Sequence, residues 1–308
     1  MTNLSRRQLL AGAAATGAAF LTAPAFPSLA VGRFAGDPGA GRLHYGAVYD
    51  WRKSLPDWER RLGRHIGVNR TYFQPGSVDG MIKRVRMDTS NNRLPHLGTK
   101  LPATWGSVAS GRNDAWLEGL LGRLKTEQRP VFLTLHHEPE NDVGGDGMRP
   151  SDFVAMQRRA IAKRREIGAL NVSIVPVLMT WTFQSLSRRN PNDWMVPEAT
   201  LFGLNSYNDW SPTNGRRWTT FGERIDHALP YVDGRPIVVG EYGCRTDRTR
   251  PGRAADWMDA AFQYAVTHNI VAMSYFNTPL HTPDVTWELD GEREPVFKWL
   301  LNSAKSVW

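Results

Sequence analysis

The sequence predicts an α/β protein built as one (β/α)8 barrel, or TIM barrel, over residues 43–308. Strand-like and helix-like segments alternate along the chain, and such alternation implies parallel strands joined by helical crossovers. Eight strand-like segments fall within about 265 residues, a usual size for one barrel domain. A doubly wound sheet is the alternative, but no glycine-rich nucleotide-binding turn follows the first strand-like segment.

The first half of the barrel region holds four strand-and-helix units. Short apolar runs between polar turns predict strands, and apolar residues at helical spacing predict helices. Asn113 and Ser151 are the candidate N-caps of two of these helices. We expect strands over residues 43–51, 65–73, 94–101 and 130–136, and helices over residues 56–64, 78–87, 114–127 and 151–167.

The second half repeats this pattern and ends on a helix. Its apolar runs include PIVVGE, which is typical of a strand that is buried on both faces. We expect strands over residues 172–183, 201–207, 236–241 and 270–276, and helices over residues 221–229, 254–267 and 295–304.

The first thirty residues resemble a twin-arginine export signal. Arg6 and Arg7 precede an apolar, alanine-rich run, which ends in a small-x-small cleavage pattern at residues 28–30. A retained membrane anchor is the alternative, but Pro24 interrupts the run and Pro27 ends it. We therefore expect cleavage, a flexible lead-in over residues 31–42, and a secreted or cell-envelope protein that is not stably inserted in the membrane.

Composition excludes several classes of protein. The chain has 308 residues and a single cysteine, Cys244, which excludes an internal disulfide framework and a zinc site with several thiolates. The formal net charge is +8, but the basic residues are scattered and no recognised nucleic-acid-binding motif is present. We expect a monomer that needs no cofactor and binds no nucleic acid.

Two glutamates stand where buried strands meet the predicted active face. Glu138 follows the fourth strand and Glu241 ends the seventh, and a barrel places its reactive groups at these carboxyl ends. Two carboxyl groups across a barrel mouth suit glycoside hydrolysis, in which one protonates the leaving oxygen and the other attacks the sugar or guides water. We predict a retaining enzyme, which requires a separation of about 5–5.5 Å between the two groups.

The residues around these glutamates resemble those of clan A glycoside hydrolases, whose acid/base Glu follows the fourth strand and whose nucleophilic Glu ends the seventh. The His137-Glu138 pair is most similar to glycoside hydrolase family 26, the β-mannanase family. The strand order matches over the whole mature chain, and the specific matches are LTLHHEPEND, GLNSYNDW, IVVGEYG and SYFN.

The resemblance implies a role for each matched residue. Glu138 would be the acid/base and Glu241 the nucleophile, while Tyr207 would hydrogen-bond the nucleophile. His137 would contact the sugar and help to position Glu138. The family usually has Trp at the end of the eighth strand, where this chain has Phe276. The substrate implied is a polysaccharide or oligosaccharide, with mannan first and other β-glycans open.

The chain has twelve tryptophans, and their positions sort them into two groups. Those after strands are candidate sugar platforms, because aromatic faces pack against the apolar faces of sugars; they are Trp51, Trp105, Trp181 and Trp210. Those within predicted helices are expected to pack against the barrel; they are Trp58, Trp116, Trp257 and Trp299. Trp287 suits either purpose.

The roles of several further residues can be interpreted in more than one way. Arg70 either binds a carboxylate near the site or forms a salt bridge within the barrel, and His96 is expected to be a core residue. The arginines after the seventh strand suit an acidic glycan, although a solvated basic loop is the default. Cys244 is expected to be a small buried residue.

Two other functions remain open. A non-catalytic carbohydrate-binding barrel would keep the aromatic face and tolerate loss of both glutamates. A metal-dependent barrel hydrolase would hold an ion among His136, Glu138 and Glu140, since histidine and carboxylates are metal ligands. We expect no metal site, because adjacent strand residues such as His136 and His137 point in opposite directions.

Overall fold

A computed structural model describes residues 33–280, 286–289 and 291–307 of the chain. The predicted signal peptide, residues 1–30, lies outside the described residues, as do the first two residues of the predicted lead-in. Among the described residues, no helix is both long and apolar enough to span a bilayer.

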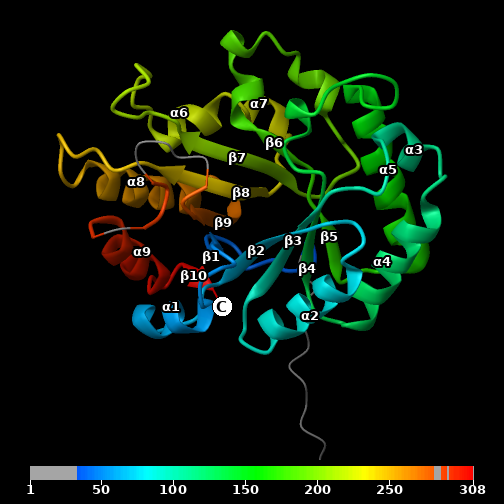
Figure 1. The fold of residues 1–308 in the computed structure, drawn as a ribbon, viewed down its shortest axis with the longest axis horizontal. Helices are drawn as coiled ribbons and strands as arrows, with labels where there is room; N and C mark the ends of the chain where they lie inside the picture. The colour runs from blue at the N-terminus through cyan, green and yellow to red at the C-terminus, as the bar shows by residue number, and fades with distance from the viewer. Residues whose placement is uncertain (1–32, 281–285, 290, 308) are drawn as a thin grey trace, which may run out of the picture. The chain divides into compact units, whose positions relative to one another are not determined.

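Parallel strands form the centre of the molecule, with helices outside them (Figure 1). The strands pair in the order β5-β4-β3-β2-β1-β9-β8-β7-β6, and the short strand β10 pairs with β1. Their bounds are β1 (Leu43–Tyr49), β2 (Val68–Phe73), β3 (Leu94–Thr99), β4 (Val131–Leu135), β5 (Val172–Ile174), β6 (Val177–Met179), β7 (Phe202–Asn208), β8 (Ile237–Cys244), β9 (Ile270–Asn277) and β10 (Ser306–Val307).

The segment that contains β5 and β6 closes the barrel. The predicted strand over residues 172–183 is divided into β5, which pairs with β4, and β6, which pairs with β7. Between them, Val175 N–H donates to Leu133 O at 2.8 Å, and Pro176 O accepts from Gly203 N–H at 3.0 Å. Proline has no N–H to continue a ladder, which accounts for the division. The predicted eight-stranded (β/α)8 barrel is thereby confirmed.

The longer helices follow the strands as predicted; the short helix over Trp105–Ala109 and the 3-10 turns are not predicted from the sequence, and three predicted details differ. They are α1 (Leu55–Leu62), α2 (Val78–Thr89), α3 (Trp105–Ala109), α4 (Asp114–Thr126), α5 (Pro150–Ile167), α6 (Phe221–Asp226), α7 (Leu229–Val232), α8 (Arg253–Thr267) and α9 (Arg293–Leu301), with 3-10 turns η1 (Pro139–Asn141), η2 (Thr180–Phe183), η3 (Ser185–Ser187) and η4 (Pro191–Trp194). The helix predicted over residues 221–229 is split into α6 and α7, since Pro230, near the start of α7, has no N–H to bond back to α6. Asn113 makes no side-chain cap bond, and α5 begins at Pro150 with Arg149 rather than Ser151 at its N-cap.

Apolar side chains fill the base of the barrel, whereas polar and aromatic side chains line its mouth. Val68, Leu94, Phe132, Val238 and Val271 form a buried cluster from the first residues of their strands. Because parallel strands all run the same way, the polar residues at their carboxyl ends gather at the opposite end. The candidate site is therefore expected at the carboxyl ends of the strands.

Residues 34–38, within the predicted flexible lead-in, pack against this base, whereas residues 39–42 are exposed. Phe34 lies against the inner cluster with its ring centroid 6.2 Å from that of Phe132. Ala35 O accepts a hydrogen bond from Ser173 Oγ at 2.9 Å, and Gly36 O lies 3.0 Å from His44 Nε2. The segment therefore caps the bottom of the barrel.

The tryptophans predicted to pack within helices do so with one exception. Trp58 and Trp257 are buried and Trp116 is partly buried. Trp299 is 61% exposed, so its prediction is wrong: it occupies the outward face of α9, whose inner face is formed by Phe297 and Leu300.

Candidate active site

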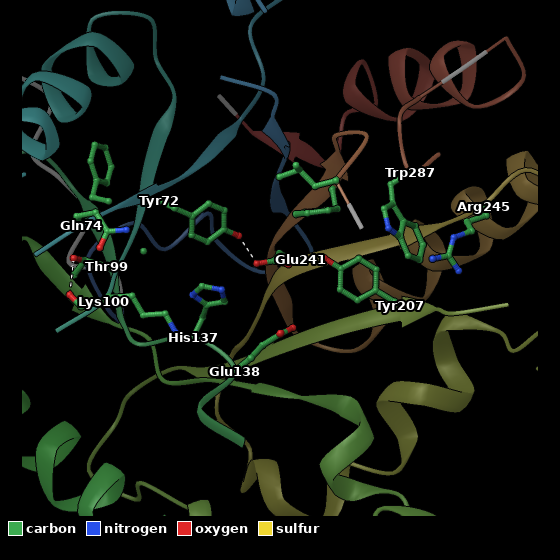
Figure 2. Close-up of a pocket in the computed structure, with 14 residues that line it drawn as sticks. Tyr72, Gln74, Thr99, Lys100, His137, Glu138, Tyr207, Glu241, Arg245 and Trp287 are labelled. Carbon is green, nitrogen blue, oxygen red and sulfur yellow. Dashed lines mark hydrogen bonds between the residues drawn. The ribbon is translucent and has the colours of Figure 1, made fainter. Parts of the chain in front are cut away.

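Glu138 and Glu241 line the same cavity of about 610 Å³ at the mouth of the barrel (Figure 2). Glu241 lies within β8, and Glu138 stands three residues after the end of β4. Glu138 has a left-handed backbone with φ of 48°, an unfavourable conformation for a residue other than glycine. Such local strain is common where a side chain is held for function.

Glu241 is held by two hydrogen-bond donors and a nearby cation. The Tyr72 hydroxyl donates to one carboxylate oxygen and the Tyr207 hydroxyl donates to the other, while Arg70 Nε lies 3.6 Å from Oε1. Burial by itself raises the pKa of Glu241, but the Arg70 charge and the tyrosine hydrogen bonds outweigh burial and hold the pKa below its ordinary value. Glu241 is therefore ionised at neutral pH.

Arg70 lies beneath the carboxylate, fully buried. Its Nε donates to Tyr72 Oη at 2.8 Å, and its Nη1 donates to His96 Nε2 at 3.0 Å. Burial, followed by the Arg70 charge, holds the pKa of His96 well below its ordinary value, so His96 is neutral and can accept. Gly240 makes room for this cation, because a Cβ there would lie 2.2 Å from Arg70 Nη1.

Glu138 has a different environment. Asn205 Nδ2 donates to its Oε1 at 2.9 Å, and Asn141 Nδ2 donates to its Oε2 at 3.3 Å. Burial is the largest influence and the negative charge of Glu241 the next, and together they raise the pKa of Glu138 to about 7. Glu138 thus keeps its proton over a pH range in which Glu241 has lost its own.

Aromatic rings and a neutral histidine complete the walls of the cavity. The Tyr207 ring meets Phe276 edge-on at 5.8 Å and lies 5.0 Å from Trp287. His137 lies 5.0 Å from the Tyr72 ring, and burial lowers its pKa to about 4. As predicted, Glu138, His137, Tyr207, Glu241 and Phe276 are brought together in one cavity.

The loop after β8 also contributes a wall. Arg245 is buried, with its guanidinium carbon 4.1 Å from the centre of the Trp287 ring, a cation–π arrangement. Both residues line the cavity. The expectation of a solvated basic loop is therefore wrong for Arg245, whose guanidinium covers an aromatic face.

A second cavity of about 670 Å³ adjoins the other side of Glu138. Glu138, Asn205 and Tyr207 line it, whereas Glu241 does not. Trp181, which is 38% exposed, lies in its wall. The position predicted for Trp181, on the face of the barrel that carries the site, is confirmed.

Three tryptophans predicted as sugar platforms lie outside both cavities, and among them Trp105 needs correction. Trp105 is fully buried, with its ring 5.5 Å from Phe153 and 6.4 Å from Trp194, because α3 turns it into the core rather than toward the mouth. Trp51 is 86% exposed and lines neither cavity. Trp210 is half-buried against Trp218 at 5.3 Å and also lines neither cavity.

Arg70 also needs correction as a substrate-binding residue. Of its two interpretations, the carboxylate partner is confirmed: that partner is Glu241, and Arg70 has no surface left for a sugar. His96 and Cys244 are buried, as predicted.

Sequence reasoning missed Tyr72 and Asn205. A usable signal was present, since alternate strand residues share a face. Tyr72 is two residues from Arg70 in β2, and Asn205 is two residues from Tyr207 in β7. Once Arg70 and Tyr207 are assigned to the interior of the barrel, the same assignment follows for their neighbours.

The two histidines of the HHEPEND segment point to different partners. The cause is not the alternation of side chains along a strand, because the segment lies beyond β4 and His136 has a φ of 59°. His136 Nε2 lies 2.6 Å from Asp142 Oδ2, while His137 lines the cavity. The described ranges contain no group of three or more His, Cys, Asp or Glu side chains placed to hold a metal ion.

No protein-family model and no curated protein matches the sequence, whereas many solved structures match the fold. The catalytic domain of a family 26 endo-β-1,4-mannanase from Bacillus sp. JAMB-750 is 13% identical, with a TM-score of 0.61 and 87% of each chain covered. An endo-β-1,4-glucanase triple mutant from Xanthomonas axonopodis pv. citri is 13% identical, with a TM-score of 0.59 over 84% of this chain and 98% of that one.

A third match is a β-mannanase from a symbiotic protist of the termite Reticulitermes speratus, complexed with gluco-manno-oligosaccharide. It is 12% identical, with a TM-score of 0.55 and 89% of each chain covered. At these identities the likeness is one of fold. The predicted resemblance to clan A glycoside hydrolases is confirmed at that level, with both endoglucanases and β-mannanases among the neighbours.

Proposed function

We propose that the protein is a retaining glycoside hydrolase that cleaves a β-linked polysaccharide, with Glu138 as the acid/base and Glu241 as the nucleophile. One observation carries the proposal. Two carboxyl groups line one cavity, and their surroundings move their pKa values in opposite directions. Such a divergence is what distinguishes an acid from a nucleophile in a glycosidase.

In the first step a Glu241 oxygen attacks the anomeric carbon as the glycosidic bond breaks. Glu138 gives its proton to the departing oxygen, so that a neutral hydroxyl leaves. Arg70 and the two tyrosines keep Glu241 ionised until it forms the bond. Neutral His137 lies beside the reacting sugar without adding charge.

In the second step water replaces Glu241 on the anomeric carbon. The attached sugar has removed the negative charge of Glu241, so one cause of the raised pKa of Glu138 is gone. Glu138, which lost its proton in the first step, therefore stays ionised more readily, and it takes a proton from the attacking water. The bond to Glu241 breaks, and both carboxyl groups return to their starting states.

We propose a β-1,4-linked mannan or glucomannan as the first substrate to test, with β-glucans second. The His137-Glu138 pair supports a mannanase, while the fold neighbours include both a β-mannanase and an endo-β-1,4-glucanase. Phe276 and Trp287, which flank Tyr207, supply the apolar wall for the sugar.

We also propose that residues 1–30 direct export by the twin-arginine route, so that the enzyme acts in the cell envelope or outside it. Replacing Arg6 and Arg7 together by Lys should retain the protein inside the cell. Mass spectrometry of exported protein should give an N-terminus at or close to residue 31. Export that is unchanged in the double variant would contradict this route.

The central test is hydrolysis of a polysaccharide panel by the wild type, Glu138→Ala and Glu241→Ala. We expect release of reducing sugars by the wild type, with NMR showing the β-anomer as the first product. Azide should rescue Glu138→Ala as a β-glycosyl azide and Glu241→Ala as an α-glycosyl azide, since each has lost a different step. Binding without hydrolysis, unaffected by either variant, would instead identify a carbohydrate-binding barrel.

A further inference from the structure

The cavity on the far side of Glu138 is unusually rich in arginine. Four arginines line it: Arg189, Arg216, Arg217 and Arg224. The carboxyl groups in its wall are those of Asp209 and of Glu138, the proposed proton donor. The lining therefore has an excess of positive charge, whereas the cavity that contains Glu241 has two carboxyl groups of its own.

Pairing within the wall does not remove this excess. Asp209 alone accepts from two of the arginines, Arg216 and Arg224. Arg217 Nη1 lies 3.0 Å from Glu223, but its side chain is 71% exposed, and exposed pairs of this kind are weak enough to exchange for another anion.

Arg189 is held by neutral acceptors. Its Nη1 donates to Thr182 Oγ1 at 3.2 Å and its Nη2 to Glu140 O at 3.1 Å. The described residues give Arg189 no ion pair. Burial raises the pKa of Glu140, but the Arg189 charge lowers that pKa in part, and Glu140 Oε1 accepts from the same Thr182 hydroxyl. The buried Nε2 of Gln184, in the same wall, has no hydrogen-bond partner. The site thus presents an orientated cation and an unused donor.

The position of this cavity identifies which part of a substrate it would receive. The acid/base gives its proton to the leaving oxygen, and this cavity contains Glu138 without Glu241. A sugar here would belong to the leaving group. Trp181 and Leu186, which are 38% and 78% exposed, offer apolar surfaces for its ring.

We propose that this cavity binds a carboxylate-bearing sugar, such as a uronic acid, on the leaving-group side of the cleaved bond. A uronate-bearing form of the β-glycan should therefore be preferred to its neutral counterpart. Guanidinium groups suit this ligand because they can donate two parallel hydrogen bonds to a carboxylate. This inference rests on the proposed function, since it presumes cleavage beside Glu138.

The test uses one polysaccharide in two forms. A uronate-bearing β-1,4-glucomannan is compared with the same polymer after chemical reduction of its carboxyl groups to primary alcohols. We expect kcat/KM to be higher for the acidic form by about tenfold, as for one added charge-assisted contact. The preference should shrink in 0.5 M NaCl, where exposed charges are screened. Mass spectrometry should find the uronate near the non-reducing end of a product.

Two variants connect this preference with the cavity. Arg189→Gln removes the cation held by neutral groups, and Arg217→Gln removes an exposed one whose loss should not affect folding. Each should lower the ratio of the two kcat/KM values, and Arg189→Lys should restore part of it. Arg60→Gln is the matched control, because Arg60 lies on α1, pairs with Asp57 and is 76% exposed; its ratio should equal that of the wild type.

The outcomes separate this inference from the proposed function. Hydrolysis of both forms at equal rates would overturn the acidic preference and leave the hydrolase intact. A preference that survives both arginine substitutions would also overturn it, because the selecting charge would lie elsewhere. Hydrolysis of neither form, nor of any panel polysaccharide, would count against the hydrolase itself.

Discussion

At the scale of single residues, the site depends on a contrast between two carboxyl groups. Glu241 has a guanidinium and two phenol hydroxyls around it, whereas Glu138 has two amide donors and a nearby negative charge. Charged and neutral donors differ in how strongly they favour an anion. The same residue type therefore has two protonation states at one pH.

This contrast predicts a bell-shaped pH profile for kcat/KM. Activity should fall as pH rises through about 7, because Glu138 loses the proton that it must donate. The acid limb should lie at a pH below the ordinary pKa of a glutamate, because activity requires ionised Glu241 and the pKa of Glu241 is lowered. Tyr207→Phe removes a donor to the anion, which should move the acid limb upward and leave the alkaline limb in place. Movement of the alkaline limb alone would contradict the assignment.

The raised pKa of Glu138 also predicts a cost in stability. Between pH 4.5 and about 7 the folded chain keeps a proton that the unfolded chain releases, so stability falls as pH rises through this window. Glu138→Gln removes that loss and should raise the melting temperature at pH 8 by about 4 °C, from roughly 1–2 kcal/mol.

Two comparisons give this stability measurement a control. At pH 4 the wild type and Glu138→Gln should melt together, because Glu138 is then protonated in both the folded and the unfolded chain. Asp146→Asn, at a fully exposed position, should change neither value. A Glu138→Gln variant that is less stable than the wild type at pH 8 would show that the carboxylate is not destabilising.

Sequence could identify the two glutamates but not their surroundings. Both stand at the ends of apolar strands, so their place at the mouth follows from the fold class alone. The hydrogen bonds of Tyr72 and Asn205 depend on which strands become neighbours across the barrel interior. The burial of Trp105 could not be predicted, because its position after β3 does not determine which way a short helix turns its ring.

At the scale of elements, β8 must pass over a buried cation. Gly240 sits in that strand, and a Cβ there would lie 2.2 Å from Arg70 Nη1 and 2.9 Å from Asn205 Oδ1. The register of β7 against β8 shifts at this point, between Leu204 and Asn205. The strand thus carries Glu241, the proposed nucleophile, while leaving space for the cation that keeps it ionised.

Gly240→Ala should accordingly lower both stability and activity. Overpacking of a full core costs about 1–3 kcal/mol, measurable by urea unfolding, and displacement of Arg70 should lower kcat. Gly119→Ala is the matched control, since Gly119 lies in α4 and a methyl group added there would meet no atom within 4 Å. It should gain up to about 1 kcal/mol. A Gly240→Ala enzyme with wild-type activity would contradict the role of this close approach.

At the scale of the whole barrel, stability and chemistry occupy opposite ends. The apolar cluster fills the base, while the polar groups of the site gather at the carboxyl ends of the strands. The alternation of strand-like and helix-like segments predicts this arrangement, but it could not predict that residues 34–38 would cap the base. The division of the fifth strand at Pro176 likewise differs from the single element expected there.

This separation predicts a substitution that affects folding without affecting catalysis. Phe34→Ala removes an aromatic ring from the base and should cost about 1–3 kcal/mol of unfolding free energy. Because the site lies at the other end, kcat and KM at 20 °C should stay within about twofold of the wild type. Phe34→Leu should recover most of the loss. A large fall in kcat with unchanged stability would contradict the division.

The most direct test of the account is to trap the intermediate. A 2-deoxy-2-fluoro glycoside with a good leaving group, matched to the best substrate of the panel, slows the second step more than the first and so accumulates the glycosyl enzyme. Intact-mass and peptide spectra should show one sugar attached to the peptide that contains Glu241. Attachment to a different residue, or turnover with inversion and no adduct, would contradict a retaining mechanism through Glu241.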